Sequence, residues 1–120
     1  MLNQIVLVGR LVKDPEIKET ESGFSLSKIT LAIPRSYKNS EGEYETDFVD
    51  CTLWKGIAEN TAEYCKKGDI IGVKGRIETS SYEKDNEKIY TTNVVAEKVT
   101  FLSQSKTNDY EENKEQDISI

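Results

Sequence analysis

Histidine is absent from this 120-residue chain, and cysteine occurs only twice. Without histidine, zinc sites built from cysteine and histidine are close to excluded, as are triads and general bases that depend on an imidazole. Cys51 and Cys65 do not form a Cys-x-x-Cys pair. Cys51 falls on the inward side of a predicted strand, so we interpret it as a small buried residue rather than a reactive thiol. We therefore expect neither a metal site nor a cofactor.

Long hydrophobic runs are also missing. No stretch approaches the roughly 18–20 apolar residues that a membrane span needs. The N-terminus lacks the basic start of a secretory signal, and its apolar run is interrupted by Gly9 and Arg10. These features predict a cytoplasmic protein without a membrane partner. With 36% hydrophobic and 32% charged residues, the chain has enough apolar material for one small domain with a charged exterior.

An excess of positive charge is lacking as well. The formal net charge of −6 argues at first against a nucleic-acid partner. However, residues 1–102 contain 14 Lys and Arg against 17 Asp and Glu, whereas residues 103–120 contain 2 against 5. Half of the excess therefore lies in a short segment without hydrophobic periodicity. We predict a folded domain over residues 1–102 and a disordered acidic tail over residues 103–120.

The tail ends in two apolar residues after an acidic stretch: Asp117, Ile118, Ser119 and Ile120. Such an end is either a frayed terminus or a short motif that docks on partner proteins.

Hydrophobic periodicity predicts five strands and one helix. The strands are expected over Asn3–Val12, Phe24–Tyr37, Thr46–Lys55, Asp69–Glu78 and Ile89–Leu102, and the helix over Ile57–Lys67. The apolar run Ile5–Val8 is typical of a strand covered on both faces, and Ser80–Lys88 is expected to be a polar loop. One helix between the third and fourth of five strands is the layout of an all-β OB-fold, a five-stranded Greek-key barrel. An SH3-like barrel, the alternative, usually lacks that helix.

Two aromatic residues share one side of the third predicted strand. Phe48, Asp50, Thr52 and Trp54 occupy every second position of that strand, so their side chains point to the same face. Three apolar side chains of that strand point the other way: Val49, Cys51 and Leu53. Flat rings on a sheet surface are the usual platform for unstacked bases.

Two tyrosines extend this set. Tyr37 lies where the second strand ends, and Tyr82 lies in the loop expected between the last two strands. Both positions are near the track that ligands follow across an OB-fold. A single strand aromatic is more often a packing residue. Together with Phe48 and Trp54, however, these residues predict a stacking site.

Basic side chains recur beside the aromatic residues. Each one alone would be an ordinary solvated charge. Their recurrence suits a groove that follows a phosphate backbone. The predicted backbone-binding residues are Arg10, Lys13, Arg35, Lys38, Lys55, Lys74, Arg76 and Lys84.

The chain resembles the bacterial single-stranded DNA-binding proteins, which also occur in phages and plasmids. The matching segments run in order through nearly all of residues 1–102: Asn3–Leu11, Lys13–Glu16, Ile29–Ile33, Asp47–Lys55, Ala58–Asn60, Lys66–Gly68, Gly75–Ile77 and Thr92–Glu97. The resemblance implies an OB-fold homotetramer whose dimers form partly through the first strand. It also implies cooperative binding of single-stranded DNA in replication, recombination and repair, and no catalytic activity. The family's stacking aromatics fall on Tyr37, Phe48, Trp54 and Tyr82.

The chain departs from the family at its C-terminus. The family usually has a long linker rich in Gly, Gln and Pro and a tip ending Asp-Ile-Pro-Phe, through which it docks replication and repair proteins. Here the tail is short and ends Asp117-Ile118-Ser119-Ile120.

Two other functions are compatible with an OB-fold. An accessory protein, such as a primosome component, would act through protein contacts or RNA, but such relatives typically lack an acidic tail. An OB-fold nuclease would need metal-binding carboxylates on the sheet. Asp50 lies between Phe48 and Trp54, but no second carboxylate at a convincing strand position joins it.

Overall fold

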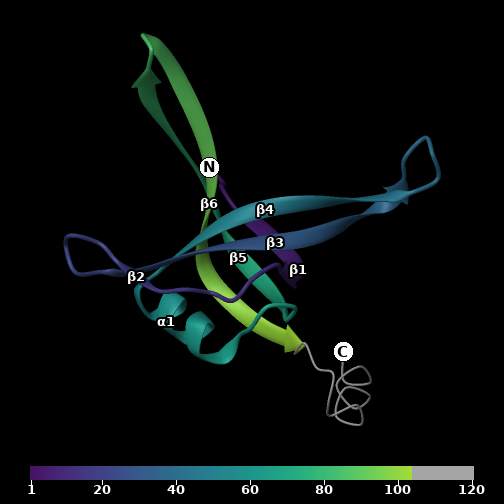
Figure 1. Ribbon diagram of the computed structural model, residues 1–120, viewed down its shortest axis with the longest axis horizontal. Helices are drawn as coiled ribbons and strands as arrows, with labels where there is room; N and C mark the ends of the chain where they lie inside the picture. Colours follow the sequence, from purple (N-terminus) through teal and green to yellow (C-terminus); the bar gives the residue numbers. More distant parts are fainter. Residues whose placement is uncertain (104–120) are drawn as a thin grey trace.

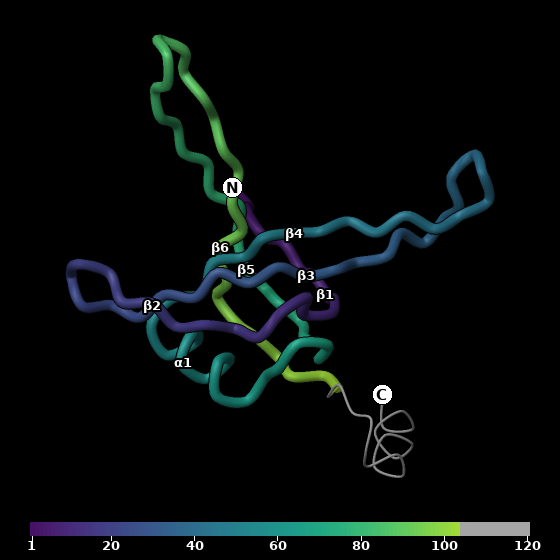
Figure 2. The backbone as a smooth tube through the Cα atoms, viewed as in Figure 1, coloured from purple at the N-terminus to yellow at the C-terminus, as the bar shows by residue number. Residues whose placement is uncertain are grey.

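Six strands and one helix make up the computed structural model, which describes residues 1–103 (Figure 1). The elements in chain order are β1 (Ile5–Leu11), β2 (Lys18–Glu19), β3 (Ser25–Lys38), β4 (Tyr44–Trp54), α1 (Lys55–Tyr64), β5 (Ile70–Lys84) and β6 (Glu87–Ser103). Three hairpins, a short one of β2 and β3 and two long ones of β3–β4 and β5–β6, project from the centre of the molecule in different directions (Figure 2).

The strands close into a barrel. They follow the order β1-β5-β6-β4-β3-β2, and a further pairing of β1 with β3 joins the two sides of the sheet. All pairings are antiparallel except that of β4 with β6, which aligns Cys51 with Val94 and Thr52 with Val95. Five closed strands with a helix between the third and fourth define an OB-fold. The predicted fold class is confirmed, and the two-residue strand β2 is an addition at its edge.

The interior of the barrel is aliphatic. Alternate residues of each strand point inward, and the core formed in this way consists of Leu11, Ile29, Leu31, Cys51, Leu53, Ala58, Cys65, Ile71, Val73, Val94 and Ala96. Both cysteines are buried free thiols, and burial raises the pKa of each to about 11. The interpretation of Cys51 as a small core residue is confirmed, because a thiol with such a pKa stays protonated at neutral pH.

The first strand is covered on one face only. Ile5, Leu7 and Leu11 turn toward the interior, whereas Val6 and Val8 remain 69% and 51% exposed. The expectation that this apolar run is covered on both faces is therefore wrong for the single chain. Its outward face carries apolar side chains that nothing in the described chain covers.

The helix ends earlier than predicted. It runs from Lys55 to Tyr64, so Lys66 and Lys67 lie beyond it. The backbone N–H of Lys66 donates to the carboxylate of Asp69 (2.8 Å), and the N–H of Gly68 donates to the carbonyl of Leu11 (2.8 Å). These two bonds turn the chain toward β5 instead of continuing the helix.

The predicted loop Ser80–Lys88 is a hairpin. β5 and β6 pair continuously up to Lys84 and Glu87, and only Asp85 and Asn86 form the turn. Both have positive φ, 53° and 65°, as a two-residue hairpin turn requires. Tyr82 and Lys84 therefore lie on a strand, not in a loop. The sequence concealed this because the β5 half of the arm, from Glu78 to Lys84, is exposed throughout and lacks apolar alternation.

The pairing of β3 with β4 is interrupted near Pro34. The register shifts between Pro34 and Lys38, which agrees with the expectation that proline, having no N–H to donate, marks a bulge or an edge. A further shift occurs in β5 between Lys74 and Gly75. A Cβ atom at Gly75 would lie 2.1 Å from the carbonyl oxygen of Val95 on β6, so only glycine fits at this position of β5.

The predicted acidic tail lies outside the described residues, except for Ser103, which ends β6. Its tip, Asp117 to Ile120, is likewise outside them. Within residues 1–103, no helix is long and apolar enough to span a membrane, and no group of three potential metal ligands occurs.

Candidate nucleic-acid interface

The outward face of β3 and β4 is the centre of the candidate site. Its residues alternate with the core residues of the same strands. The register places Leu26 opposite Trp54 and Ala32 opposite Phe48. Trp54 is 38% exposed and Phe48 is 67% exposed. The prediction that these two rings lie on the side of β4 opposite its core residues is confirmed.

The middle of this face is polar. The hydroxyl Oγ1 of Thr30 on β3 donates to Oδ1 of Asp50 on β4 over 2.6 Å. A cleft of about 260 Å³ lies beside this pair. Its lining comes from β3, β4, β6 and the segment after β1: Lys13, Lys28, Ile29, Thr30, Asp50, Cys51, Thr52 and Asn93. Polar groups that can donate and accept hydrogen bonds therefore lie between the two rings.

Tyr82 belongs to the same surface through the β5–β6 arm. On β5 it shares its parity with Glu78, and Glu78 pairs with Asn93 of β6, which lines the cleft. The side chain of Tyr82 is 52% exposed. The outward face of the arm thus continues the outward face of the barrel.

Tyr37 lies in the irregular part of the β3–β4 arm. It is 64% exposed and follows the bulge after Pro34. Because the bulge interrupts the pairing, strand parity does not fix the face to which Tyr37 belongs. Tyr44, which the sequence analysis did not select, is exposed on the facing strand, and the ammonium of Lys38 lies 5.7 Å from the centre of its ring.

Two of the predicted backbone-binding arginines form ion pairs. Arg35 contacts Asp47 at 2.9 Å and Glu45 at 3.4 Å. The hydrogen bond and the charge of Asp47 raise the pKa of Arg35, and the hydrogen bond from Arg35 lowers the pKa of Asp47. Arg76 pairs with Glu78 at 2.8 Å and with Glu97 at 3.8 Å.

The other predicted cations are distributed around the barrel. Arg10 donates to the carbonyl of Gly68 at 2.7 Å, and Lys55 lies 4.6 Å from the ring centre of Phe24. Lys74 lies opposite Lys98 in the β5–β6 strand register, and Lys84 lies opposite Glu87 at the tip of the arm. Lys13 is the one predicted cation that lines the cleft beside Asp50. The sequence analysis did not select Lys28. Lys28 lies two positions before Thr30 on β3, so its side chain is on the same outward face as that of Thr30.

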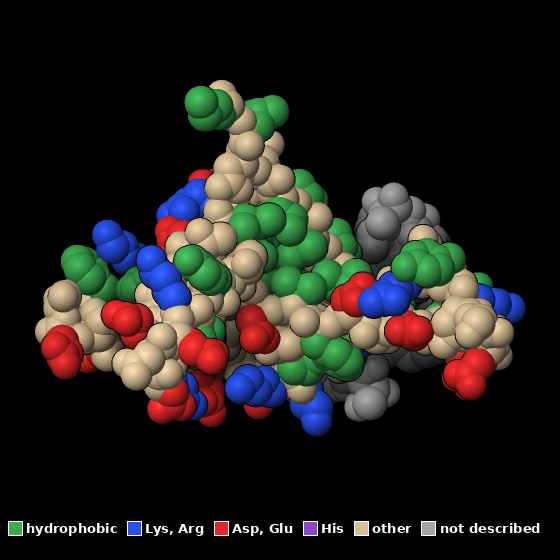
Figure 3. Space-filling view, turned by 90° about the horizontal axis from the view of Figure 1, so that it is seen from above, with side chains coloured by type: hydrophobic (Ala, Val, Ile, Leu, Met, Phe, Trp, Pro, Cys, Tyr) green, Lys and Arg blue, Asp and Glu red, His purple; other side chains and the backbone are tan. Residues whose placement is uncertain are grey.

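Hydrophobic side chains gather on the outside of the molecule. Figure 3 shows them in a broad band over the middle of one face and again on the projecting hairpins, with basic and acidic side chains between them. All nine aromatic residues of the described chain are among its exposed side chains: Phe24, Tyr37, Tyr44, Phe48, Trp54, Tyr64, Tyr82, Tyr90 and Phe101. A surface with this many rings can stack on flat ligands.

Known proteins share both this sequence and this fold. Residues 2–102 match the Single-strand binding protein family. The chain is 52% identical over 103 residues to single-stranded DNA-binding protein B of Bacillus subtilis. The alignment covers 85% of this chain and 91% of that protein. It is 49% identical over 109 residues to single-stranded DNA-binding protein 3 of Listeria innocua. This alignment covers 90% of this chain and 68% of that protein.

A solved structure agrees with these sequence matches. The single-stranded DNA-binding protein of Thermus aquaticus, as a deletion mutant, superimposes with a TM-score of 0.72 at 30% identity over 85% of this chain. The alignment covers 51% of that protein, so this chain spans about half its length. The match to the family extends over the whole OB-fold. The chain belongs to the single-strand binding protein family.

Proposed function

We propose that this protein binds single-stranded DNA without strong sequence preference, by base stacking and by electrostatic contacts to the phosphate backbone. One observation carries the proposal: the buried core contains no aromatic ring, while all nine rings in the described residues are exposed. Aromatic residues usually contribute their large apolar area to a core. A fold that keeps them outside has them available for a ligand.

Stacking accounts for the lack of sequence preference. Each engaged base contributes about 1–3 kcal/mol, and every base has a π-face. Phe48 and Trp54 lie on one face of β4, and Tyr82 lies on the arm that continues it. The matches to proteins named for single-stranded DNA binding support this interpretation. Binding of this kind requires no catalytic group, so we propose a non-enzymatic role.

The uncovered face of β1 supports the expected oligomer. Val6 and Val8 present an apolar strip at the surface of the single chain. Burial of such a strip against a second copy stabilises an assembly. We propose a homotetramer that coats single strands in the cytoplasm during replication, recombination and repair, and that recruits partner proteins through its C-terminal tip.

Trp54 is the only tryptophan, so its fluorescence reports directly on the site. We expect its emission to be quenched when a poly-thymidine strand is added, because a base stacks on the indole. Unchanged emission at saturating DNA and low salt would contradict the proposal. The mass of the protein with and without a long thymidine strand gives the oligomeric state in the same set of experiments.

A comparison of DNA and RNA strands separates this function from that of an accessory OB protein. At one salt concentration, we expect tighter binding to the DNA strand of equal length and sequence. Equal or tighter binding to RNA would favour the accessory role.

A further inference from the structure

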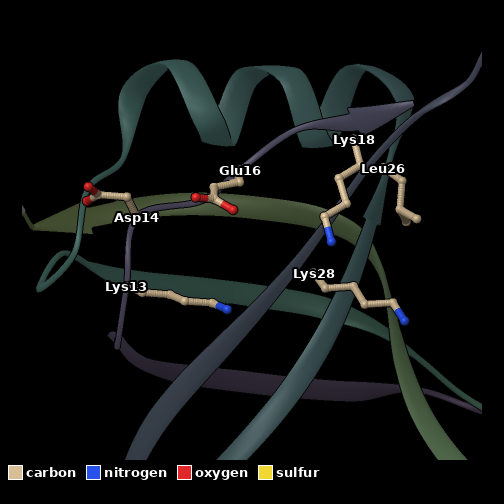
Figure 4. Close-up of a pocket in the computed structure, with 6 residues that line it drawn as sticks. All are labelled: Lys13, Asp14, Glu16, Lys18, Leu26 and Lys28. Carbon is tan, nitrogen blue, oxygen red and sulfur yellow. The ribbon is translucent and has the colours of Figure 1, made fainter. Parts of the chain in front are cut away.

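A second cleft lies beside β2, next to the face that carries Trp54. It has a volume of about 410 Å³, within the range of about 300–1,000 Å³ that ligand pockets occupy. Figure 4 shows Lys18 and Leu26 on one side, Lys28 below them, and Lys13 extending toward Lys28 from the segment after β1. Asp14 and Glu16 complete the lining. Three lysines therefore line one cleft; the ammonium groups of Lys13 and Lys18 point toward Lys28, and that of Lys28 extends away from Lys13 (Figure 4).

The strand register joins this cleft to the stacking face. Lys18 of β2 pairs with Leu26 of β3, and Leu26 pairs with Trp54 of β4. Directly paired residues point to the same side of a sheet, and neighbouring strands lie about 4.8 Å apart. Lys18, Leu26 and Trp54 thus form a row about 10 Å long across three strands. A base stacked on Trp54 has Leu26 beside it and a cation at the end of the row.

The two clefts are also continuous with each other. Lys13 and Lys28 line both of them. One groove therefore runs from β2 past these two lysines to Thr30, Asp50 and Asn93. Its far end adjoins the β5–β6 arm with Tyr82.

The lysines of the cleft differ from the arginines of the candidate site in their partners. Arg35 and Arg76 are held by carboxylates. The ammonium groups of Lys13, Lys18 and Lys28 form no ion pair or hydrogen bond with any residue of the described chain. The two acids in the lining reduce the positive potential, and three lysines against two carboxylates leave a net charge of +1 among the lining residues. Asp14 keeps its charge while it accepts the backbone N–H of Lys67 at 2.7 Å. Three lysines without a side-chain partner therefore line one cleft. Five more lysines in residues 1–103 lack such a partner but line neither cleft: Lys66, Lys67, Lys74, Lys84 and Lys98.

We propose that the cleft is a phosphate-binding subsite that extends the DNA path beyond Trp54. The strand leaves the indole along Leu26, and Lys18 and Lys28 contact its next phosphates, with Lys13 shared between the two clefts. This proposal rests on the proposed binding of single-stranded DNA. It assigns a role to two residues, Lys18 and Lys28, and to the β2–β3 hairpin.

The test is the salt dependence of binding to a thymidine oligonucleotide. For single strands, log K falls with log salt with a slope of about −0.7 per phosphate contact. The double variant Lys18→Ala, Lys28→Ala should reduce the slope by about 1.4 and weaken binding about 25-fold at 0.1 M salt, with the difference vanishing near 1 M. The quenching of Trp54 at saturation should stay unchanged.

Two further variants control the experiment. Lys66→Ala, Lys67→Ala removes the same charge from an exposed turn outside both clefts, and it should change the slope by much less. Glu16→Gln should act with the opposite sign and tighten binding, because it removes a carboxylate that opposes the phosphates. Thermal unfolding of each variant shows that it is folded.

Each result has a distinct meaning. A slope that the Lys18 and Lys28 substitutions leave unchanged, or change no more than the control pair, overturns the subsite while the proposed function stands. If the unmodified protein neither binds the oligonucleotide nor shows quenching, both proposals fail.

Discussion

The inside and the outside of this barrel are built from different residue types. The interior contains Leu, Ile, Val, Ala and Cys together with the polar residues Ser27, Thr61 and Asp69, and the exterior holds every aromatic ring of the described residues. β4 shows the contrast within a single strand, because Cys51 and Leu53 are buried while Phe48 and Trp54 are exposed. Stability and binding are therefore assigned to separate side chains, and substitutions on the two sides should affect different measurements.

The interior is expected to give the largest effect. Leu53 is fully buried, and Leu53→Ala should lower the free energy of unfolding by about 2–5 kcal/mol, because it removes buried apolar area and leaves a cavity. Denaturant unfolding measures this loss. The dissociation constant for DNA of the protein that remains folded should change less than about twofold. A loss of affinity as large as that of a stacking-residue variant would show that the two sides are not independent.

The stacking residues should show the reverse. Trp54→Ala should weaken binding of a labelled thymidine strand by about 1–3 kcal/mol, or about 5- to 150-fold, with little change in stability. Phe48→Ala should act in the same direction. Phe101→Ala is the control, since this exposed ring pairs with Tyr64 at 6.1 Å at the other end of β6. If Trp54→Ala unfolds the protein instead, the indole serves packing.

The acidic residue among the rings should oppose binding. Asp50→Asn removes a negative charge from the stacking face and keeps an oxygen that can accept the Thr30 hydroxyl. We expect affinity for DNA to rise by up to about fivefold at 0.1 M salt, and by less at higher salt. Glu63→Gln, at an exposed position of α1, removes the same charge away from the face and is the control. A loss of affinity in Asp50→Asn would mean that the carboxylate contacts the bases.

The smallest effect concerns the ion pair of Arg35 with Asp47. Because Arg35 lowers the pKa of Asp47, the pair stabilises the fold above the ordinary carboxyl pKa of about 3.9. This contribution is lost as the pH falls further, through the lowered pKa in the folded protein. Melting temperatures of the unmodified protein and Asp47→Asn should therefore differ slightly at neutral pH and converge in acid. A difference that is independent of pH would contradict the ion-pair explanation.

Parity within β4 could be predicted from the sequence because one face of the strand is buried. A half-buried strand must alternate, so the positions of Phe48 and Trp54 followed from those of Cys51 and Leu53. The order of strands and helix, and with it the OB-fold, followed from similar patterns.

The parts that could not be predicted are those where this signal fails. The β5 half of the arm lacks apolar alternation because Glu78 to Lys84 are all exposed, so Tyr82 was assigned to a loop. The apolar side chains of Val6 and Val8 predicted a strand buried on both faces, but both remain exposed in the single chain. Beyond the helix, the N–H of Gly68 donates to the carbonyl of Leu11, a tertiary contact that a helical pattern does not contain, and the N–H of Lys66 bonds locally to Asp69. The ion pairs of Arg35 with Asp47 and of Arg76 with Glu78 could not be predicted either, because they depend on which residues the folded sheet brings together.

The parallel pairing of β4 with β6 has a consequence for how the chain folds. It joins Cys51 to Val94, residues far apart in the sequence, whereas the three hairpins join residues that are close together. Contacts between distant residues require the closure of a long loop, and they slow folding more than local contacts do. The pairing of β1 with β5, which joins Ile5 to Gly75, spans an even longer stretch of sequence, so closure of the barrel at these two seams should limit the folding rate. The length of a hairpin arm, whose pairings are local, should by contrast have little influence on the speed of folding.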